Sequence, residues 1–563
     1  MAAAAPTPVA EPVTMATLRS VMGRSPGIRW RPAHDTLEPH KCYVCAADRI
    51  TGRSVADRPI PENRPMAYRD LRDFLAQLEQ QGQLRRVSVP FNVERGRNEL
   101  QALMRHLAQT DGPALVLDRL EGYNTPGVPL VFNPYGTRER TAMILGTRDP
   151  LEAKLRHVKV LQEPGSWIKP TLVDRARAPC KEVVIPRDQV SVDRHIPHVF
   201  FGREGSSYIT GGVVVTKDPE TGVRNVGAYR VTSFWNCEHP QGGSYSEEQM
   251  KKQLSIFAFW NPPMNHIGLH LARAQKLGRP LELAIACQVD PALHLACATG
   301  IPFGMDEYDY AGGLRGSPVE LVKCESVDLE VPATAEYIIE GVFRPDVPTD
   351  IIGWHSNSVG YYDKHQIFPI FDITAITHRR DPLWYGTIEM MPPFDHNYMA
   401  LLPVEGELLA DLQRKLPEVK DVVVTPNMTY IVQLNVDGAA KPHPEFGKYV
   451  LHAAWGAAGR WPRTAKILVV VGPDVDPYDL EAVEWAIQTR VQPYSDIIIN
   501  RSAQAMVLDP SAPKGPQGFP TTSEQMGIDA TIKVPERFSE YAEVSQADPA
   551  QVRSVAAKLA GIL

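Results

Sequence analysis

The chain has 563 residues, of which 43% are hydrophobic and 22% charged, and its formal net charge is −7 at neutral pH. A chain of this length and composition folds into several globular domains without disulfide or metal staples. Its basic residues are scattered, which excludes the positive stripe of a nucleic-acid-binding protein. Apolar runs such as KILVVVG at 466–472 are far shorter than the roughly 20 residues of a membrane-spanning helix. We therefore expect a small-molecule partner, no nucleic acid and no membrane.

The N-terminal stretch and the cysteines indicate a cytoplasmic protein. The start, MAAAAPTPVAEP, lacks the basic and apolar regions of a secretory signal. Seven cysteines are an odd number spread over a long chain, which is typical of a reducing compartment. Cys42 and Cys45 form a lone CxxC without a second pair nearby, so we read the spacing as incidental. Residues 1–65 are rich in Ala, Pro and Arg and predict a flexible extension.

Residues 66–178 predict a small α/β domain. The stretch YRDLRDFLAQLEQQG predicts an amphipathic helix that ends at Gly82. Its apolar side chains recur at helical spacing: Leu71, Phe74, Leu75 and Leu78. Extended apolar segments such as PALVLDRL and VPLVF alternate with helical ones further along.

Residues 179–390 predict a mostly β central domain. The β-branched runs YITGGVVVTKD and NVGAYRVTSF flank the turn cluster DPETG, which predicts a hairpin. IFPIFDITAITHRRDP predicts a further pair of strands, and HIGLHLARAQKLG predicts a helix that ends at Gly278.

Residues 391–563 predict a second α/β domain. KILVVVG predicts a buried strand, and DPYDLEAVEWAIQTRV predicts a helix with Pro477 near its first turn. The end of the chain, DPAQVRSVAAKLAGIL, predicts an amphipathic helix that packs on its own domain or on a neighbouring subunit.

Three segments combine polar residues in ways that packing alone does not require: NVGAYR at 225–230, NHIGLH at 265–270 and the segment MDEYDYAGG from 305. The amide oxygen of Asn225, a nitrogen of His266 and the carboxylate of Glu307 form a mixed N/O set that suits a manganese-like divalent ion. Each also has a structural alternative: Asn225 ends a hairpin, His266 caps a helix, and Glu307 lies on a solvated loop.

A resemblance adds specificity to this set. The stretch AGGLRGSPVELVKCESVDLEVPATAEYIIEG closely resembles the signature of the UbiD-like decarboxylases, which use prenylated flavin mononucleotide. The similarity continues, in family order, through YRDLRDFLAQLEQQGQLRRV, NVGAYR, ITAITHRRDP and VVVGPDVDPYDLEAVEWAIQTRV, over about residues 66–510. It implies an N-terminal α/β domain, a central split β-barrel that binds the flavin, and a C-terminal α/β domain that mediates oligomerisation as a homodimer or homohexamer.

The resemblance also assigns roles to residues. It implies that Asn225, His266 and Glu307 bind a divalent ion such as Mn²⁺, with His270 as a less favoured substitute for His266. It implies a second, K⁺ site whose ligands are Val226, Ala296, Cys297, Thr299, Glu307 and the side chain of Arg490. Further cofactor-binding positions are Gly227, Ala228, Tyr229, Arg230, Asn265 and Arg460, the last standing where relatives have a phosphate-side lysine. Gly227 would let the backbone approach the flavin closely.

One catalytic segment departs from the family pattern. Relatives carry a network of two glutamates and one arginine, with both glutamates in E-G-P-F-G-E, whereas this chain has DIIGWH. Asp350 and His355 stand where the glutamates are expected, and Asp346 is a further candidate. The hypothesis is that Arg230 holds the substrate carboxylate and pairs with Asp350. His355, with a reference pKa near 6.5, then donates the proton at neutral pH, with Trp354 as an aromatic wall.

The resemblance implies reversible, non-oxidative decarboxylation of an aromatic or aryl-conjugated unsaturated carboxylic acid through a covalent prenylated-flavin adduct, with a flavin prenyltransferase as cofactor supplier. Within the family, the alternative is the polyprenyl-hydroxybenzoate decarboxylase of ubiquinone synthesis. From another class, the alternative is a flavin-binding redox protein, because similar barrels host flavin reductases.

Overall fold

The computed structural model describes residues 68–209, 211–233, 245–363, 366–457, 465–515, 520–533, 544–545 and 547–559. The expected extension over residues 1–65 and the pair of Cys42 and Cys45 lie outside these ranges. Within the ranges, every helix is too short or too polar to span a bilayer.

The first described helix, α1 (Leu71–Gln80), confirms the predicted amphipathic helix. Asp70 caps its N-terminus by accepting a hydrogen bond from Asp73 N, and its four predicted apolar side chains are buried. A four-stranded sheet follows, ordered β1, β3, β5 and β21: Leu84–Val87, Ala114–Leu117, Leu130–Phe132 and Trp384–Gly386. The last strand, β21, comes from far along the chain. The N-terminal sheet therefore includes a strand that follows the central domain in the sequence.

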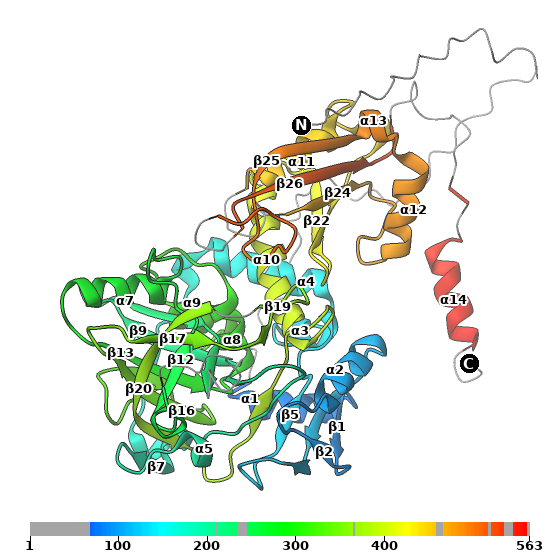
Figure 1. Cartoon of the computed structure of the whole chain (residues 1–563). Coiled ribbons are helices and arrows are strands. Elements are labelled where there is room, and N and C mark those ends of the chain that lie inside the picture. The colour runs from blue at the N-terminus through cyan, green and yellow to red at the C-terminus, as the bar shows by residue number, and fades with distance from the viewer. Residues whose placement is uncertain are drawn as a thin grey trace, which may run out of the picture. The chain divides into compact units, whose positions relative to one another are not determined.

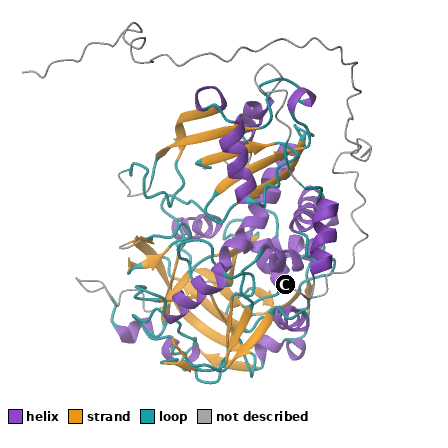
Figure 2. Cartoon of the chain, turned by 90° about the vertical axis from the view of Figure 1, so that its right-hand side faces the viewer, coloured by secondary structure: helices purple, strands orange, loops and turns teal. Residues whose placement is uncertain are grey.

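The central domain is built on a large curled sheet, which Figure 2 shows as orange strands that curve round rather than lie flat. Its described strands run in the order β10 (Arg224–Ala228), β9 (Gly212–Lys217), β13 (Leu281–Cys287), β16 (Tyr337–Phe343), β20 (Gln366–His378), β12 (Gln253–Ile256), β11 (Val231–Ser233) and β8 (Ser207–Ile209). Two more strands pair with β20: β7 (Val183–Pro186) and β17 (Thr349–Ile352). The predicted hairpin is confirmed as the antiparallel pair β9 and β10, with Val214 opposite Gly227.

One predicted pair of strands is a single strand. IFPIFDITAITH lies within β20, a strand of 13 residues without a turn. The strand stays continuous because it pairs with β16, β12, β17 and β7 along its length, so each part of its backbone finds a partner. Local sequence pattern cannot report these partners, since they are distant along the chain.

Both faces of the central sheet are buried. Val214 of β9 packs in one apolar cluster together with Ile267 and Leu271 of helix α7 (His266–Lys276). The neighbours of Val214 in β9 belong to a second cluster with helices α8 (Pro291–Ala298) and α9 (Glu307–Arg315). Alternate residues of a strand face opposite sides, so α7 covers one face and the α8 and α9 pair covers the other. The predicted helix over HIGLHLARAQKLG is thereby confirmed.

The C-terminal domain is a five-stranded sheet ordered β22 (Val419–Val424), β23 (Thr429–Leu434), β24 (Ile467–Val471), β26 (Thr522–Ala530) and β25 (Ile497–Gln504). Helices α10 (Asp395–Gln413) and α11 (Phe446–Trp455) pack on one face and α12 (Leu480–Arg490) on the other (Figure 1). The predicted strand KILVVVG is β24. The predicted helix begins at Leu480, after the Asp479 cap, so Pro477 lies three residues before its first residue. The final helix, α14 (Pro549–Leu559), is also present, and the predicted mixed α/β fold class is confirmed.

Candidate active site

Three predicted metal ligands gather at β10, the edge strand of the central sheet. Asn225 Oδ1 lies 3.2 Å from His266 Nδ1, and Val226 N donates a hydrogen bond to Glu307 Oε2 at 2.8 Å. His266 is the first residue of α7 and Glu307 is the first residue of α9. Two helices from opposite faces of the sheet thus begin beside the same strand, which explains why residues so distant in sequence meet here.

The chemistry of this group suits a cation. Burial raises the pKa of Glu307 to about 7 and lowers the pKa of His266, so an uncompensated carboxylate is costly here and the imidazole is neutral. Among the described residues no three His, Cys, Asp or Glu side chains form a metal cluster, so a metal at this place requires the amide oxygen of Asn225. An amide oxygen, an imidazole nitrogen and a carboxylate are ligands of manganese-like ions.

Three neighbouring positions have contacts of their own within the protein. His270 is fully buried and bonded to Thr216 Oγ1 at 2.9 Å, one turn further into α7 than His266. At Gly227 a Cβ would lie 2.6 Å from the ring of Tyr229, so this position leaves no room for a side chain. Asn265 caps α7 by accepting from Gly268 N at 3.0 Å. The predicted close approach of the backbone to the flavin at Gly227 stays a prediction.

The predicted K⁺ ligands lie in two different parts of the structure. Cys297 at the end of α8 is buried, and after burial the nearby Glu307 is the next cause that raises its pKa. Ala296 and Thr299 lie in the same turn, where Thr299 N donates to Ala296 O at 3.1 Å. Arg490 is elsewhere: its guanidinium bonds both carboxylate oxygens of Asp474 in the C-terminal domain, at 3.1 and 2.5 Å. The side chain of Arg490 thus pairs with Asp474, and its part in the K⁺ site stays a prediction. Arg460 lies outside the described residues.

A cavity of about 650 Å³ adjoins this group and contains the predicted catalytic arginine. Arg230 lies in the short connection between β10 and β11, and its guanidinium carbon is 5.4 Å from the ring centre of Tyr208 and 5.5 Å from that of Phe257. The lining includes predicted cofactor positions and two aromatic side chains: Ala228, Tyr229, Arg230, Asn265, Phe257 and Phe259. Residues 504–508 of the C-terminal domain complete the wall. Two domains therefore enclose a partly aromatic space around one positive charge.

The acidic partner of Arg230 is Glu389, not the predicted Asp350. Glu389 forms an ion pair with Arg230 Nη2, and Arg230 Nη1 donates to Ser356 O at 2.6 Å. Asp350 lies in β17 opposite Phe368 of β20, where its carboxylate accepts from Ile351 N at 2.9 Å, and it does not line the cavity. Burial lowers and Glu389 raises the pKa of Arg230, with a net upward shift, so Arg230 stays charged.

A second glutamate stands behind Ser356. Glu204 is 3% exposed and accepts hydrogen bonds from both the backbone N, at 3.1 Å, and the hydroxyl of Ser356. Burial raises the pKa of Glu204 to about 7, and Arg230 opposes this rise. Sequence reasoning missed Glu204 and Glu389. The sequence gives only indirect evidence for these two acids. A buried arginine needs acidic partners, but the residues next to it in the sequence do not indicate which acids these are.

His355 is placed at the cavity, but its protonation differs from the prediction. It is 3% exposed, its Nδ1 lies 3.1 Å from Gly353 O, and its ring meets Phe257 edge to face at 5.1 Å. Burial, followed by the charge of Arg230, lowers the pKa of His355 to about 4. The imidazole is therefore neutral at neutral pH, where we had expected a protonated donor. Trp354 packs with Arg203, 4.7 Å from its ring centre, and does not line the cavity.

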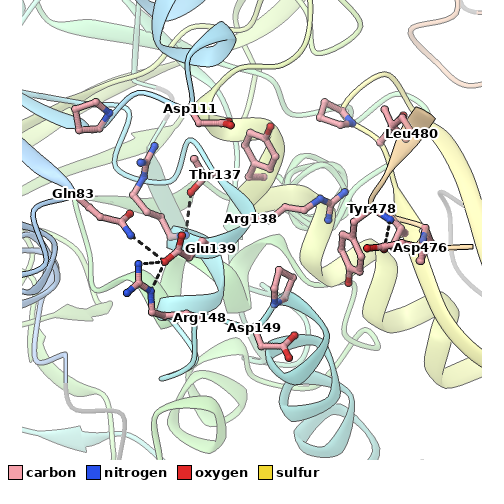
Figure 3. Close-up of a pocket in the computed structure, with 18 of the residues that line it drawn as sticks. Gln83, Asp111, Thr137, Arg138, Glu139, Arg148, Asp149, Asp476, Tyr478 and Leu480 are labelled. Carbon is pink, nitrogen blue, oxygen red and sulfur yellow. Dashed lines mark hydrogen bonds and ion pairs between the residues drawn. The ribbon is translucent and has the colours of Figure 1, made fainter. Parts of the chain in front are cut away.

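A larger cavity of about 1000 Å³ lies away from these residues (Figure 3). The charged side chains around it bond one another: Glu139 accepts from Gln83 at 3.1 Å and pairs with Arg148, and Arg138 pairs with Glu405 at 2.7 Å. We assign the active site to the cavity at Arg230, because that cavity adjoins the Asn225, His266 and Glu307 group.

Comparison with known families and proteins agrees with this architecture. The N-terminal domain of the 3-octaprenyl-4-hydroxybenzoate carboxy-lyase, UbiD, matches residues 75–156, its Rift-related domain matches residues 171–392, and its C-terminal domain matches residues 397–530. An uncharacterized protein of Archaeoglobus fulgidus is 32% identical over 485 residues, which cover 83% of this chain and 92% of that protein.

Solved structures match over nearly their whole length. The UbiD-class enzyme HmfF from Pelotomaculum thermopropionicum, in complex with FMN, is 28% identical and has a TM-score of 0.71 over 86% of this chain and 98% of its own. An evolved dimeric form of that enzyme was solved with prenylated FMN. The vanillic acid decarboxylase of Sedimentibacter hydroxybenzoicus is 28% identical, with a TM-score of 0.72 over 88% and 99% of the two chains. With all three domains matched in family order, the chain belongs to the UbiD family and is a decarboxylase.

Proposed function

We propose that the protein decarboxylates an aromatic or aryl-conjugated unsaturated carboxylic acid, reversibly and without oxidation, in the cavity at Arg230. The observation that carries the proposal is the buried guanidinium of Arg230 in a partly aromatic cavity that also borders the Asn225, His266 and Glu307 group. A guanidinium orients a carboxylate through two parallel hydrogen bonds, and aromatic walls suit an aromatic ring.

The cofactor that we propose is prenylated FMN with Mn²⁺ and K⁺. Asn225, His266 and Glu307 would hold the divalent ion, which neutralises the flavin phosphate. Carbonyl groups at Val226, Ala296, Cys297 and Thr299, together with Glu307, would hold the monovalent ion. When bound, the prenylated flavin supplies an electron sink for the carbon that loses CO₂. In this scheme Arg230 positions the substrate carboxylate, and residues 504–508 with Phe257 keep water from the reacting carbon.

The divalent site can be tested without turnover. We expect Glu307→Gln to weaken Mn²⁺ binding by at least about tenfold, because even an outer-sphere partner of a metal contributes that much. Metal content after dialysis, measured by mass spectrometry, and flavin retention, measured by absorbance, check this. Glu248→Gln neutralises a glutamate of the same domain whose side chain is 80% exposed, and it should leave both unchanged. Unchanged Mn²⁺ content in Glu307→Gln would remove Glu307 from the site.

The activity is tested with the protein co-expressed with a flavin prenyltransferase and supplied with benzoic, hydroxybenzoic and cinnamic acids. We expect CO₂ release without NAD(P)H and incorporation of one solvent deuterium into the product. A polyprenyl-hydroxybenzoate substrate tested in parallel separates the ubiquinone-pathway alternative. Oxidation of NAD(P)H without CO₂ release, or full activity with plain FMN, would favour a flavin redox protein instead.

A further inference from the structure

We propose that Glu389 carries the proton of this reaction: it takes up a proton when the substrate carboxylate binds beside Arg230, and it delivers that proton to the carbon that loses CO₂. This inference rests on the proposed function and deepens it. It assigns the role to a residue outside every segment that the sequence patterns had singled out for catalysis.

The position of Glu389 suits it to this role. It lies three residues after β21, the strand that returns from the central domain to the N-terminal sheet, and its carboxylate pairs directly with Arg230 Nη2. The side chains of Arg230 and Glu389 are 12% and 16% exposed, and both line the 650 Å³ cavity. Glu389 is thus an acid that touches both the guanidinium and the space in which a substrate is bound.

Glu204 has a different position. It contacts Arg230 through Ser356, whose N–H and hydroxyl it binds while Ser356 O accepts from Arg230. It is absent from the lining of the cavity, and its carboxylate is bonded to Ser356. We therefore treat Glu204 as a positioning residue that holds Ser356, and through it Arg230, in place.

The charges around Glu389 explain the uptake of a proton. The titratable groups that face it are Arg230, Glu204, His355 and His396. Burial lowers the pKa of both histidines, to about 4 for His355, so near neutral pH the positive charge comes from Arg230. Two carboxyl groups already share that charge. A third carboxylate, from the substrate, gives an excess of negative charge that protonation of one carboxylate relieves.

With Glu389 as the acid, the proton that the product gains has a defined source. The substrate carboxylate loses CO₂ and leaves an electron pair on its former carbon. The O–H bond of protonated Glu389 breaks as a C–H bond forms at that carbon, and the resulting carboxylate pairs with Arg230 again. One proton enters from solvent for each substrate bound, and no oxidant or reductant is needed.

Calorimetry of the protein loaded with FMN and Mn²⁺ tests the proposal without turnover. Benzoate, 4-hydroxybenzoate and cinnamate serve as probes, titrated in buffers of different ionisation enthalpy. We expect uptake of about one proton per bound probe, so that the affinity for the probe falls as the pH rises. In Glu389→Gln, the uptake and the pH dependence should disappear while binding persists, since Arg230 is freed from its partner.

Two further variants separate Glu389 from its neighbours. Glu389→Asp keeps the carboxylate and should keep the proton uptake. Glu204→Gln should also keep the proton uptake, because Glu389 remains. Uptake that persists in Glu389→Gln, or that is lost in Glu204→Gln, would overturn the proposal and leave the proposed decarboxylation standing. Absence of uptake with all three probes would also overturn it. Failure of the CO₂ assay with intact proton uptake would instead count against the proposed function.

Discussion

Replacement of Arg230 by alanine is expected to abolish decarboxylation, with a loss of at least about 10²- to 10³-fold in kcat/KM. Loss of a single preorganised charge-stabilising group at a reacting centre costs this much in other enzymes. Here the change also leaves Glu389 and Glu204 without their shared cation. The same cavity would then repel an incoming carboxylate rather than bind it.

The measurement is the initial rate of CO₂ release by the prenylated-FMN enzyme, with flavin content determined for each variant. Arg203→Ala is the matched control, because Arg203 is exposed and its guanidinium packs on Trp354 outside the cavity. Arg230→Lys keeps the charge without the planar fork and should retain an intermediate rate. Activity of Arg230→Ala within tenfold of the parent, at equal flavin content, would show that Arg230 is not catalytic.

The largest expected effect on stability is at Lys154 in helix α4 (Pro150–Gln162). Lys154 is fully buried, and its Nζ lies 2.6 Å from Asp421 Oδ1, 3.3 Å from Glu405 Oε2 and 3.1 Å from the hydroxyl of Tyr478. Burial alone lowers the pKa of Lys154, but Glu405 and Asp421 raise it above its usual value, so the ammonium is charged. It bonds a helix that precedes the central domain to the sheet of the C-terminal domain.

We expect Lys154→Met to lower the free energy of unfolding by about 3–5 kcal/mol, because removal of one partner from a buried ion pair leaves an uncompensated buried charge. Urea denaturation followed by circular dichroism gives this value. Lys159→Met, an exposed position of the same helix, is the control and should change little. The double variant Lys154→Met and Asp421→Asn should regain part of the loss. Equal stability of Lys154→Met and the parent would mean that this network does not hold the two elements together.

Much of the architecture was predictable from local sequence. Helix α1, helix α7 and the hairpin of β9 and β10 follow from the spacing of apolar residues and from turn residues between them, and the structure confirms all three. These features are local because their free energy depends on neighbours a few residues away. The prediction of two strands at β20 was wrong because the partners of this strand are distant along the chain. A long strand with several partners has no local signal that distinguishes it from two short ones.

In the candidate site, too, some residues were predictable from the sequence and others were not. NVGAYR, NHIGLH and the segment from residue 305 stood out by composition and resemblance, and the structure brings Asn225, His266 and Glu307 to one edge strand. The partners of Arg230 did not stand out. Asp350 and His355 fall in the segment that carries the acidic pair in the resemblance, whereas the chain places Glu389 and Glu204 around the guanidinium.

By itself, the sequence determined the class of this protein: its family, the order of its domains, and the strand that carries Asn225. The tertiary structure decided which acids face Arg230 and in which protonation state His355 and Glu204 stand. The physical reason is that residue type and spacing report local conformation. Ion pairing and pKa depend on burial and on charges from distant segments, here 159 residues apart for Arg230 and Glu389 (389 minus 230).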